Sequence, residues 1–310
     1  MSETADISRT RAWIMAARPQ TLPAAASPVL VGTGLAVTDG VFAPLPALAA
    51  LVGAALIQVG TNFANDYYDA VKGADTADRE GFTRVTAGGI IAPERVKLAT
   101  AVAFGLAVLV GTYLVVVGGV PILVVGLASI AAGILYTGGP YPFGYYGLGD
   151  LFVFVFFGLV AVTGTYHVQA VSAVSGFPTA LPAGSVTVEA VVASLPMAGL
   201  ITAILVVNNV RDLESDREAG KRTLAVRLGY RASRAEYVGL LALAYVVPVW
   251  FVVRGFSPTV LAPLVTLPYA ALVSRTVLTR TDGEALNPAL ERTGRLTAAF
   301  AALFAAGLAV

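Results

Sequence analysis

Long apolar runs dominate this chain, and their lengths restrict it to few folds. Roughly 20 consecutive apolar residues cross the hydrocarbon core of a bilayer as a helix. Nine such runs are present, at residues 15–38, 42–64, 98–117, 119–137, 149–171, 187–210, 236–253, 256–274 and 296–310. The first contains Arg18 and three prolines, so we expect it to be kinked or amphipathic. The sequence predicts an all-α polytopic membrane protein with about nine transmembrane helices, forming one domain over residues 1–310.

Positive charges lie almost entirely on one side of the predicted membrane. With a cytoplasmic N-terminus, the inside segments are 1–14, 65–97, 138–148, 211–235 and 275–295. Counting Arg18 with the first, these segments hold all of the chain's 20 Lys and Arg residues except Arg254. Loops on the cytoplasmic side carry an excess of Lys and Arg. We therefore predict a multi-pass protein of the cell membrane whose N-terminus and functional site are cytoplasmic.

Composition excludes several function classes. The chain has no cysteine, which removes disulfides, thiolate metal sites and cysteine nucleophiles. Its formal net charge of +1 gives no reason to expect a nucleic-acid partner. The remaining partners to consider are the lipid bilayer and small molecules that enter from it or from the cytoplasm.

Two acidic motifs follow apolar segments that open onto this same side. In each, amides precede two carboxylates spaced three or four residues apart, which places both carboxylates on one face of a helix that continues past the bilayer. The first motif, "NFANDYYD", contains Asn62, Asn65, Asp66 and Asp69; the second, "NNVRDLESD", contains Asn208, Asn209, Asp212 and Asp216.

Carboxylate pairs of like charge are unfavourable unless a cation lies between them. Mg2+ prefers oxygen ligands and is usually held by one or two carboxylates together with substrate phosphates. Basic residues that suit phosphate oxygens flank both motifs: Lys72, Arg79 and Arg84 near the first, and Arg211, Lys221 and Arg222 near the second. The pattern predicts a site for a magnesium-bound diphosphate. A hydrocarbon tail on that diphosphate would explain why the site lies at a membrane surface.

Two other interpretations use the same residues. Charged residues at helix ends also serve as topology anchors, and a transporter would place polar groups along a pathway. A transport pathway predicts ionisable groups near the bilayer midplane, and those are nearly absent here. The alternatives are therefore a membrane enzyme acting on a lipid diphosphate, which we favour, and a membrane transporter.

Five stretches of the chain resemble the UbiA superfamily of intramembrane aromatic prenyltransferases. They are "ARPQTLPAAASPVLVGT" (17–33), "NFANDYYDAVKGADT" (62–76), "RVTAGG" (84–89), "YTGGPYPFGYYGLGDLFVFVFFG" (136–158) and "NNVRDLESDREAGKRTLAVRLG" (208–229). Within the superfamily, the sequence is most similar to members that prenylate 1,4-dihydroxy-2-naphthoate in menaquinone biosynthesis.

The resemblance implies a helical bundle around a central cavity and an Mg2+-dependent prenyltransferase. The expected reaction joins the polyprenyl group of an allylic polyprenyl diphosphate to 1,4-dihydroxy-2-naphthoate, with decarboxylation, giving demethylmenaquinone. Another aromatic acid or a glycerol-phosphate ether lipid is the alternative acceptor.

The resemblance also implies roles for individual residues. The expected catalytic and metal-binding residues are Asp66, Asp69, Asp212 and Asp216, and the expected substrate-binding residues are Asn62, Asn65, Lys72, Arg84, Asn208 and Lys221. Many members carry a third carboxylate seven residues after the first Asp; here that position is Gly73, and Asp75 follows. We further expect Tyr136 and Asp150, in the loop "YTGGPYPFGYYGLGD", to contact the aromatic acceptor.

Overall fold

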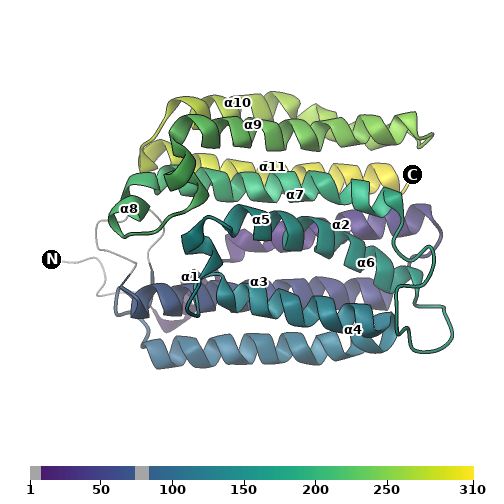
Figure 1. Ribbon diagram of the computed structural model, residues 1–310. Coiled ribbons are helices and arrows are strands. Elements are labelled where there is room, and N and C mark those ends of the chain that lie inside the picture. The colour runs from purple at the N-terminus through teal and green to yellow at the C-terminus, as the bar shows by residue number, and fades with distance from the viewer. Residues whose placement is uncertain (1–7, 74–83) are drawn as a thin grey trace.

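In a computed structural model, which describes residues 8–73 and 84–310, the chain forms a bundle of helices packed side by side (Figure 1). The described residues contain no strand, which confirms the predicted all-α class. The elements in chain order are α1 (Arg9–Ala17), η2 (Pro19–Thr21), α2 (Leu22–Thr38), α3 (Pro44–Val71), α4 (Pro93–Leu135), η3 (Phe143–Tyr146), α5 (Gly149–Val153), η4 (Phe154–Val160), α6 (Ala161–Ala170), α7 (Val188–Arg211), α8 (Leu213–Glu218), α9 (Leu224–Val253), η5 (Pro258–Thr266), α10 (Leu267–Thr279) and α11 (Gly283–Leu308).

Nine membrane-length segments occur within the described residues, as the apolar runs predict. Seven helical stretches are long and apolar enough to cross a bilayer. One of them, α4, contains two spans, and α11, with 26 residues, supplies the ninth. The charged first half of α11 explains why only its second half, 296–310, is visible as an apolar run in the sequence.

Helix α4 is divided at Gly119, and Figure 1 shows its two halves side by side. Gly119 has φ 73°, in the left-handed region that glycine adopts at little cost. A Cβ at this position would lie 1.8 Å from the carbonyl oxygen of Pro178, and the neighbouring Val120 N–H donates to that same oxygen at 2.8 Å. The turn between the predicted spans 98–117 and 119–137 therefore requires glycine at this position.

The first predicted span is broken, as its arginine and prolines indicate. Helix α1 ends at Ala17, and Arg18 has φ 51°, which is uncommon for a residue other than glycine. The short η2 follows, and α2 then continues to Thr38. At the break, the Ala17 carbonyl accepts a hydrogen bond from the Asn62 side chain, and the Arg18 carbonyl accepts from both the backbone N–H and the hydroxyl of Thr21.

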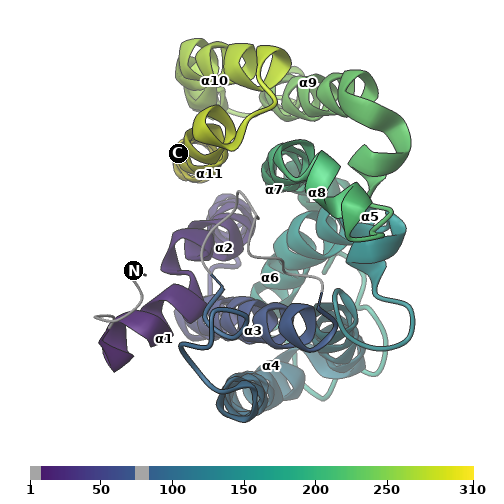
Figure 2. The ribbon, with the colours of Figure 1, turned by 90° about the vertical axis from the view of Figure 1, so that its left-hand side faces the viewer.

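Helix α7 is the most deeply buried span, with 72% of its apolar window inside the bundle. It packs with α9 and α11 around the main hydrophobic core, which includes Met197, Leu200, Tyr237 and Phe300. Figure 2, turned to view the bundle nearly end-on, shows α7, α9, α10 and α11 grouped on one side and α1 to α4 on the other. The two acidic motifs belong to these two groups, since one ends α3 and the other ends α7.

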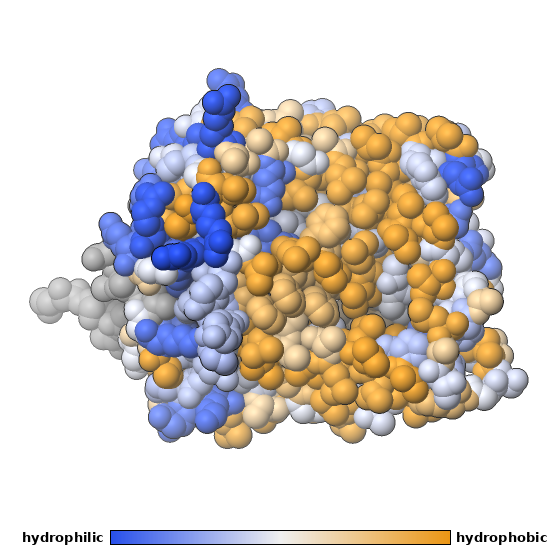
Figure 3. Space-filling model, viewed as in Figure 1, coloured by the Kyte–Doolittle hydropathy of each residue, from blue (hydrophilic) through white to orange (hydrophobic). Residues whose placement is uncertain are grey.

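The surface has the pattern of a membrane protein. Figure 3 shows a broad hydrophobic band around the middle of the molecule. Hydrophilic residues gather most densely at one end, which Figure 1 shows to be the end with α8 and the C-terminal end of α3. Both acidic motifs lie at this polar end.

Candidate functional site

A cavity of about 990 Å³ opens inside the bundle and reaches both acidic motifs. Nine of the twelve site residues expected from the sequence line it: Asn62, Asn65, Asp69, Arg84, Tyr136, Asn208, Asp212, Asp216 and Lys221. The other three, Asp66, Lys72 and Asp150, are not among its lining residues. Residues more than 140 positions apart in the chain are thus brought to one cavity.

Helix α3 continues past the predicted membrane edge to Val71, so the first acidic motif is helical. Asn62, Asp66 and Asp69 are all buried, four and three residues apart on one face of this helix. Asp69 Oδ2 accepts a hydrogen bond from Arg84 Nη2 at 2.8 Å, and its Oδ1 accepts one from the Tyr145 hydroxyl at 2.5 Å. Both donors come from other segments of the chain.

Asp66, about one turn before Asp69 on α3, contacts the segment that precedes α4. Its Oδ2 accepts hydrogen bonds from both the backbone N–H of Thr86, at 3.1 Å, and the Thr86 hydroxyl, at 2.5 Å. Asp66 is only 1% exposed. In this arrangement Asp66 fixes the segment around Thr86 against α3, and Arg84 of the same segment reaches Asp69.

The second motif has a different construction. The sequence predicts Asp212 and Asp216 on one face of a continuing helix, but α7 ends at Arg211 and Asp216 lies on the separate helix α8. Asp212 is paired with the adjacent Arg211. Arg211 donates from Nε to Asp212 Oδ1 and from Nη2 to Asp212 Oδ2, both at 2.7 Å. The same guanidinium donates to Asn208 Oδ1 and to Asn287 Oδ1 of α11, each at 2.8 Å. Both charged side chains are 1% exposed. Arg211 therefore orients Asp212 and joins the end of α7 to α11.

Tyr145 connects the two motifs. Its hydroxyl donates to Asp69 of the first motif, and its ring lies under the Lys221 ammonium, 4.9 Å from the ring centroid. Lys221 Nζ is also 3.5 Å from Asp216 Oδ1 in the second motif, and the Arg222 N–H donates to the Tyr145 carbonyl at 2.8 Å. A cation over an aromatic face is attracted by the ring quadrupole. The loop that carries Tyr145 is thus held between both acidic motifs.

Lys72 follows α3 directly and contacts the loop after α4. Its ammonium donates to the carbonyl oxygens of Thr137 and Gly139, at 2.6 and 3.1 Å, and lies 5.4 Å from the centroid of the Tyr145 ring. Partial burial lowers the pKa of Lys72 from its ordinary value, and the charge of Asp69 acts in the opposite direction. Lys72 therefore tethers the loop after α4 to the end of α3.

Tyr136 lines the cavity, whereas Asp150, in the first turn of α5, is buried and does not line it. The Tyr136 hydroxyl packs against the start of α5, only 3.0 Å from the position that a Cβ on Gly149 would take. Burial raises the pKa of Tyr136, and the negative charges of Asp150, Asp69 and Asp216 raise it further. Tyr136 is therefore a neutral phenol at physiological pH. Asp150 is 5% exposed, and its Oδ2 has no hydrogen-bond partner among the described residues.

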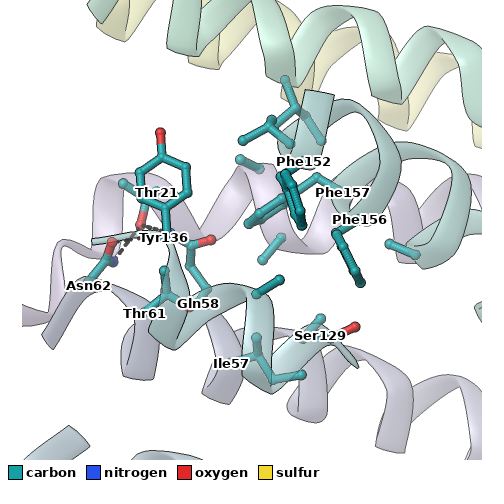
Figure 4. A pocket seen from close by; sticks show the side chains of 18 of the residues that line it. Thr21, Ile57, Gln58, Thr61, Asn62, Ser129, Tyr136, Phe152, Phe156 and Phe157 are labelled. Carbon is teal, nitrogen blue, oxygen red and sulfur yellow. Dashed lines mark hydrogen bonds between the residues drawn. The ribbon is translucent and has the colours of Figure 1, made fainter. Parts of the chain in front are cut away.

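The cavity beyond the acidic motifs is apolar. Its lining there comes mainly from α3, α4, η4 and α7, with residues such as Ile57, Leu114, Ile122, Phe156, Val160 and Leu205. Within this part, Phe152, Phe156 and Phe157 lie close together on one wall (Figure 4). One cavity therefore combines a charged end with a hydrocarbon-lined interior, which suits an amphiphilic molecule with an anionic head.

The charged end offers oxygen ligands to a divalent cation. The acidic-motif carboxylates that line the cavity are Asp69, Asp212 and Asp216, accompanied by the amides of Asn65 and Asn208; Glu291 of α11 also lines it. The described residues contain no group of three or more His, Cys, Asp or Glu close enough to hold a metal ion by themselves. Such a donor set fits a hard cation that takes its remaining ligands from a bound phosphate.

Sequence reasoning missed Tyr145 and Thr86 as partners of the first motif. Tyr145 is one of four tyrosines in a loop where interfacial anchoring is the ordinary role, and Thr86 follows Arg84 without any distinguishing pattern. Only the fold shows that both reach α3. Arg79 and Asp75, which the sequence also singled out, lie outside the described residues.

Comparison with known proteins gives consistent matches across nearly the whole chain. A model of the UbiA prenyltransferase family matches residues 25–304. The 1,4-dihydroxy-2-naphthoate octaprenyltransferase of Escherichia coli (strain K12) is 41% identical over 297 residues, covering 93% of this chain and 91% of that protein. The enzyme of the same name from Mycobacterium tuberculosis (strain ATCC 25618 / H37Rv) is 38% identical over 298 residues, covering 96% of each chain.

Solved structures share the fold at low sequence identity. A UbiA homolog from Archaeoglobus fulgidus bound to GPP and Mg2+ superposes with a TM-score of 0.65 at 17% identity, covering 96% of this chain and all of that one. A UbiA homolog from Aeropyrum pernix K1 gives a TM-score of 0.63 at 15% identity, covering 92% of this chain and 96% of that one.

Proposed function

The chain belongs to the UbiA prenyltransferase family, and on this premise we propose that it prenylates 1,4-dihydroxy-2-naphthoate. The donor is an allylic polyprenyl diphosphate, and the carboxylate of the acceptor leaves as CO2 to give demethylmenaquinone in its hydroquinone form. Two relatives that are 38–41% identical over more than nine-tenths of this chain carry the name of that activity. The observation that carries the proposal is the single cavity that joins both acidic motifs to an apolar interior.

The diphosphate of the donor binds at the charged end of the cavity. Arg84 and Lys221 each pair with a motif carboxylate, at 2.8 and 3.5 Å, and both line the cavity where the phosphates would lie. A guanidinium matches two phosphate oxygens at once, and an ammonium is a mobile point charge. Lys72, Asn65 and Asn208 extend this polar surface, while the prenyl chain lies along the apolar lining.

Asp69, Asp212 and Asp216 are the cavity-lining carboxylates that would hold Mg2+, with Asp66 behind Asp69 as the fourth member of the set. Bound Mg2+ neutralises the charge that develops on the departing diphosphate. The solved Archaeoglobus fulgidus homologs contain Mg2+ together with GPP or DMAPP, which supports this assignment.

Ionisation of an allylic diphosphate requires mainly stabilisation of the leaving group, because the allylic cation is itself delocalised. Arg84 and Lys221 provide preorganised positive charge at the place where negative charge develops. The cation is then attacked by the electron-rich ring carbon of the acceptor. The new carbon–carbon bond forms, the bond to the carboxylate breaks, and its electron pair restores the aromatic ring.

The acceptor binds between the diphosphate end and the phenylalanine wall. Tyr136 lines this part of the cavity and stays protonated, so it can donate a hydrogen bond to an anionic acceptor. Asp150 is buried and is not among the residues that line the cavity, so its charge acts on the acceptor side through Tyr136, whose pKa it helps to raise. The acceptor ring thus meets the allylic carbon at the boundary between the polar and apolar parts of the cavity.

We place the charged end of the cavity and the N-terminus on the cytoplasmic side. The positive-inside distribution of Lys and Arg supports this orientation. Because the chain has no cysteine, a single introduced cysteine reports sidedness without background. Glu214→Cys on exposed α8 should react with an impermeant maleimide in inverted vesicles only, and Ser257→Cys at the start of η5 in right-side-out vesicles only.

The decisive experiment uses purified protein with polyprenyl diphosphate, Mg2+ and 1,4-dihydroxy-2-naphthoate labelled at its carboxylate. We expect a prenylated naphthohydroquinone by mass and release of labelled CO2. Asp66→Ala and Asp212→Ala should both abolish transfer without loss of membrane-inserted protein. A wild-type protein that leaves this acceptor unchanged, or full turnover in both variants, would overturn the proposal.

A further inference from the structure

Gln58 is a polar residue in the apolar part of the cavity, and it is not among the residues that bind the donor, the metal or the acceptor in the proposed reaction. It lies on α3 one turn before Asn62, lines the cavity and is 8% exposed. Figure 4 shows Gln58, Thr21 and Asn62 on one side of the pocket and Phe152, Phe156 and Phe157 on the other. A buried amide in such a place is costly unless its hydrogen bonds are made.

Hydrogen bonds to two backbone carbonyls determine which way the Gln58 amide points. The Thr21 hydroxyl donates its only hydrogen to the Arg18 carbonyl at 2.8 Å, so its oxygen must accept from the side chains near it. Asn62 Nδ2 donates to the Ala17 carbonyl at 2.9 Å, so Asn62 Oδ1 is an acceptor. Both carbonyl groups, which lie at the break, can only accept hydrogen bonds. They therefore determine which atoms of Thr21 and Asn62 are donors and which are acceptors.

The amino group of Gln58 is consequently occupied. Gln58 Nε2 donates to Thr21 Oγ1 at 3.0 Å and to Asn62 Oδ1 at 3.3 Å. A rotated amide would place an oxygen against two acceptors, so this orientation is the only one compatible with the network. Gln58 Oε1 is then a buried acceptor, and none of the described residues donates to it. A ligand that enters the cavity can donate a hydrogen bond to it.

The wall across the cavity suits an aromatic ring. Phe143 and Phe152 stack with centroids 4.0 Å apart and planes 14° apart, and Phe152 and Phe156 are 5.9 Å and 10° apart. Phe152 and Phe156 both line the cavity. The nearly parallel rings of Phe152 and Phe156 give this wall an aromatic surface against which another ring can pack.

We propose that Gln58 Oε1 accepts a hydrogen bond from a hydroxyl of the aromatic acceptor while the acceptor ring packs against Phe152 and Phe156, so that Gln58 selects a hydroxylated ring. This inference rests on the proposed function. In 1,4-dihydroxy-2-naphthoate the 1-hydroxyl donates to the adjacent carboxylate, as in salicylate. The 4-hydroxyl is the free donor, and it is the group that Gln58 recognises.

The test compares two ligands that differ only in that hydroxyl: 1,4-dihydroxy-2-naphthoate and 1-hydroxy-2-naphthoate. Their dissociation constants are measured on purified protein with Mg2+ and a non-reactive thiolodiphosphate analogue of the donor, so that binding is separated from chemistry. Wild-type protein should bind the dihydroxy ligand about tenfold more tightly or better, since the monohydroxy ligand leaves the buried Gln58 oxygen without that donor. Gln58→Leu should reduce this preference to about twofold or less.

Ser129→Ala provides a matched control. Ser129 also lines the cavity, but its hydroxyl donates to the Val125 carbonyl of its own helix at 2.8 Å. This variant should keep the wild-type preference. Affinity for the thiolodiphosphate should be unchanged in Gln58→Leu, whereas a variant that had only disturbed Asn62 would bind it more weakly.

Gln58 has no such role if Gln58→Leu retains the full preference, or if wild-type protein binds both ligands equally. If Gln58→Leu does not insert into the membrane, Gln58→Met, an unbranched replacement of similar length, is used instead. The comparison of the two ligands on wild-type protein needs neither variant. Wild-type protein that prenylates 1,4-dihydroxy-2-naphthoate but does not distinguish the two ligands defeats only this inference. Failure of that turnover defeats the proposed function instead.

Discussion

The two acidic motifs differ in which parts of the chain satisfy their carboxylates. Asp66 and Asp69, at the end of α3, take their hydrogen bonds from Thr86, Arg84 and Tyr145, which belong to two other segments. Asp212, at the end of α7, takes two from the adjacent Arg211. These contacts of the first motif thus come from other segments of the chain, whereas those of Asp212 come from its neighbour in sequence.

This contrast has a physical consequence. The partners of the first motif, Arg84 and Tyr145, lie in loops and line the cavity, so they can exchange a carboxylate for a bound phosphate. Arg211 is buried with 1% exposure and is also held by two asparagine side chains. We infer that Arg211 is a structural partner that keeps Asp212 oriented, and that the movable cations are Arg84 and Lys221.

The largest expected effect tests whether both motifs are needed. Asp69→Asn and Asp212→Asn should each lower kcat by about a hundredfold or more, as expected when a group that stabilises developing charge is removed. The measurement is product formation at saturating substrates. Glu214→Gln is the control, since Glu214 pairs with Arg217 on exposed α8 and should leave turnover unchanged. Full activity in either Asp variant would show that one motif is dispensable.

The next prediction concerns stability, where the second motif should be the more sensitive. Arg211→Leu removes a cation that donates two hydrogen bonds to the buried Asp212 carboxylate and should destabilise the protein by about 3 kcal/mol. Thr86→Val removes one of two hydrogen bonds to Asp66 and should cost about 1–2 kcal/mol. Unfolding midpoints of both variants in detergent without substrate provide the comparison. Equal losses of stability in the two variants would contradict the expectation that Asp212 depends more on the charged Arg211 than Asp66 depends on the neutral Thr86 hydroxyl.

Tyr145→Phe removes the link between the motifs while keeping the ring under Lys221. We expect kcat/KM for the donor to fall about tenfold, the typical range for losing a hydrogen bond to a charged group. In the Asp69→Asn background the same substitution should have little further effect, because the two residues act through one contact. An undiminished effect in that background would mean that Tyr145 acts elsewhere.

The smallest expected effect concerns the ion pair between Arg280 and Asp282, which is exposed, in contrast to the buried Arg211–Asp212 pair. Asp282, at the start of α11, accepts a hydrogen bond from Arg280 at 2.8 Å and caps the helix through the Ala285 N–H at 3.0 Å. These contacts lower the pKa of Asp282 to about 2, and the hydrogen bond from Arg280 contributes more than that from the Ala285 N–H. Because the folded pKa lies below the unfolded value of about 3.9, the stabilisation is present at neutral pH and is lost as the pH falls through about 2.

Asp282→Ala should therefore lower the unfolding midpoint slightly at pH 7, by far less than Arg211→Leu, because exposed pairs are screened by solvent. The difference from wild type should narrow as the pH is lowered toward 2. A loss as large as that of Arg211→Leu would show that burial does not account for the contrast between these two pairs.

The sequence predicts the helical spans and the locations of the two motifs well, because both are encoded in continuous stretches. The apolar runs identify nine spans, and Gly119 is consistent with the turn between two of them. The partners of the motifs could not be predicted in the same way. Thr86 reaches Asp66 only because the segment before α4 folds back on α3, and no local pattern distinguishes it from other threonines.

Gln58 illustrates the same limit. In the sequence it is a single polar residue in an apolar run, compatible with lipid-facing, helix-packing or substrate-binding roles. The hydrogen bonds that orient it depend on Ala17 and Arg18, more than 35 residues away, and on the left-handed backbone at Arg18. Asp66 is a second case: its spacing predicts a place beside Asp69, but the fold turns it toward Thr86 and away from the cavity lining.

The central claim is that the two motifs act on one metal-bound diphosphate. The most direct test is a crystal structure with Mn2+ and the thiolodiphosphate analogue, in which anomalous scattering locates the metal. We predict metal density within about 2.2 Å of carboxylate oxygens from both motifs, Asp69 on one side and Asp212 or Asp216 on the other, with the diphosphate between them. Metal bound by one motif alone, or a diphosphate outside this cavity, would contradict the account.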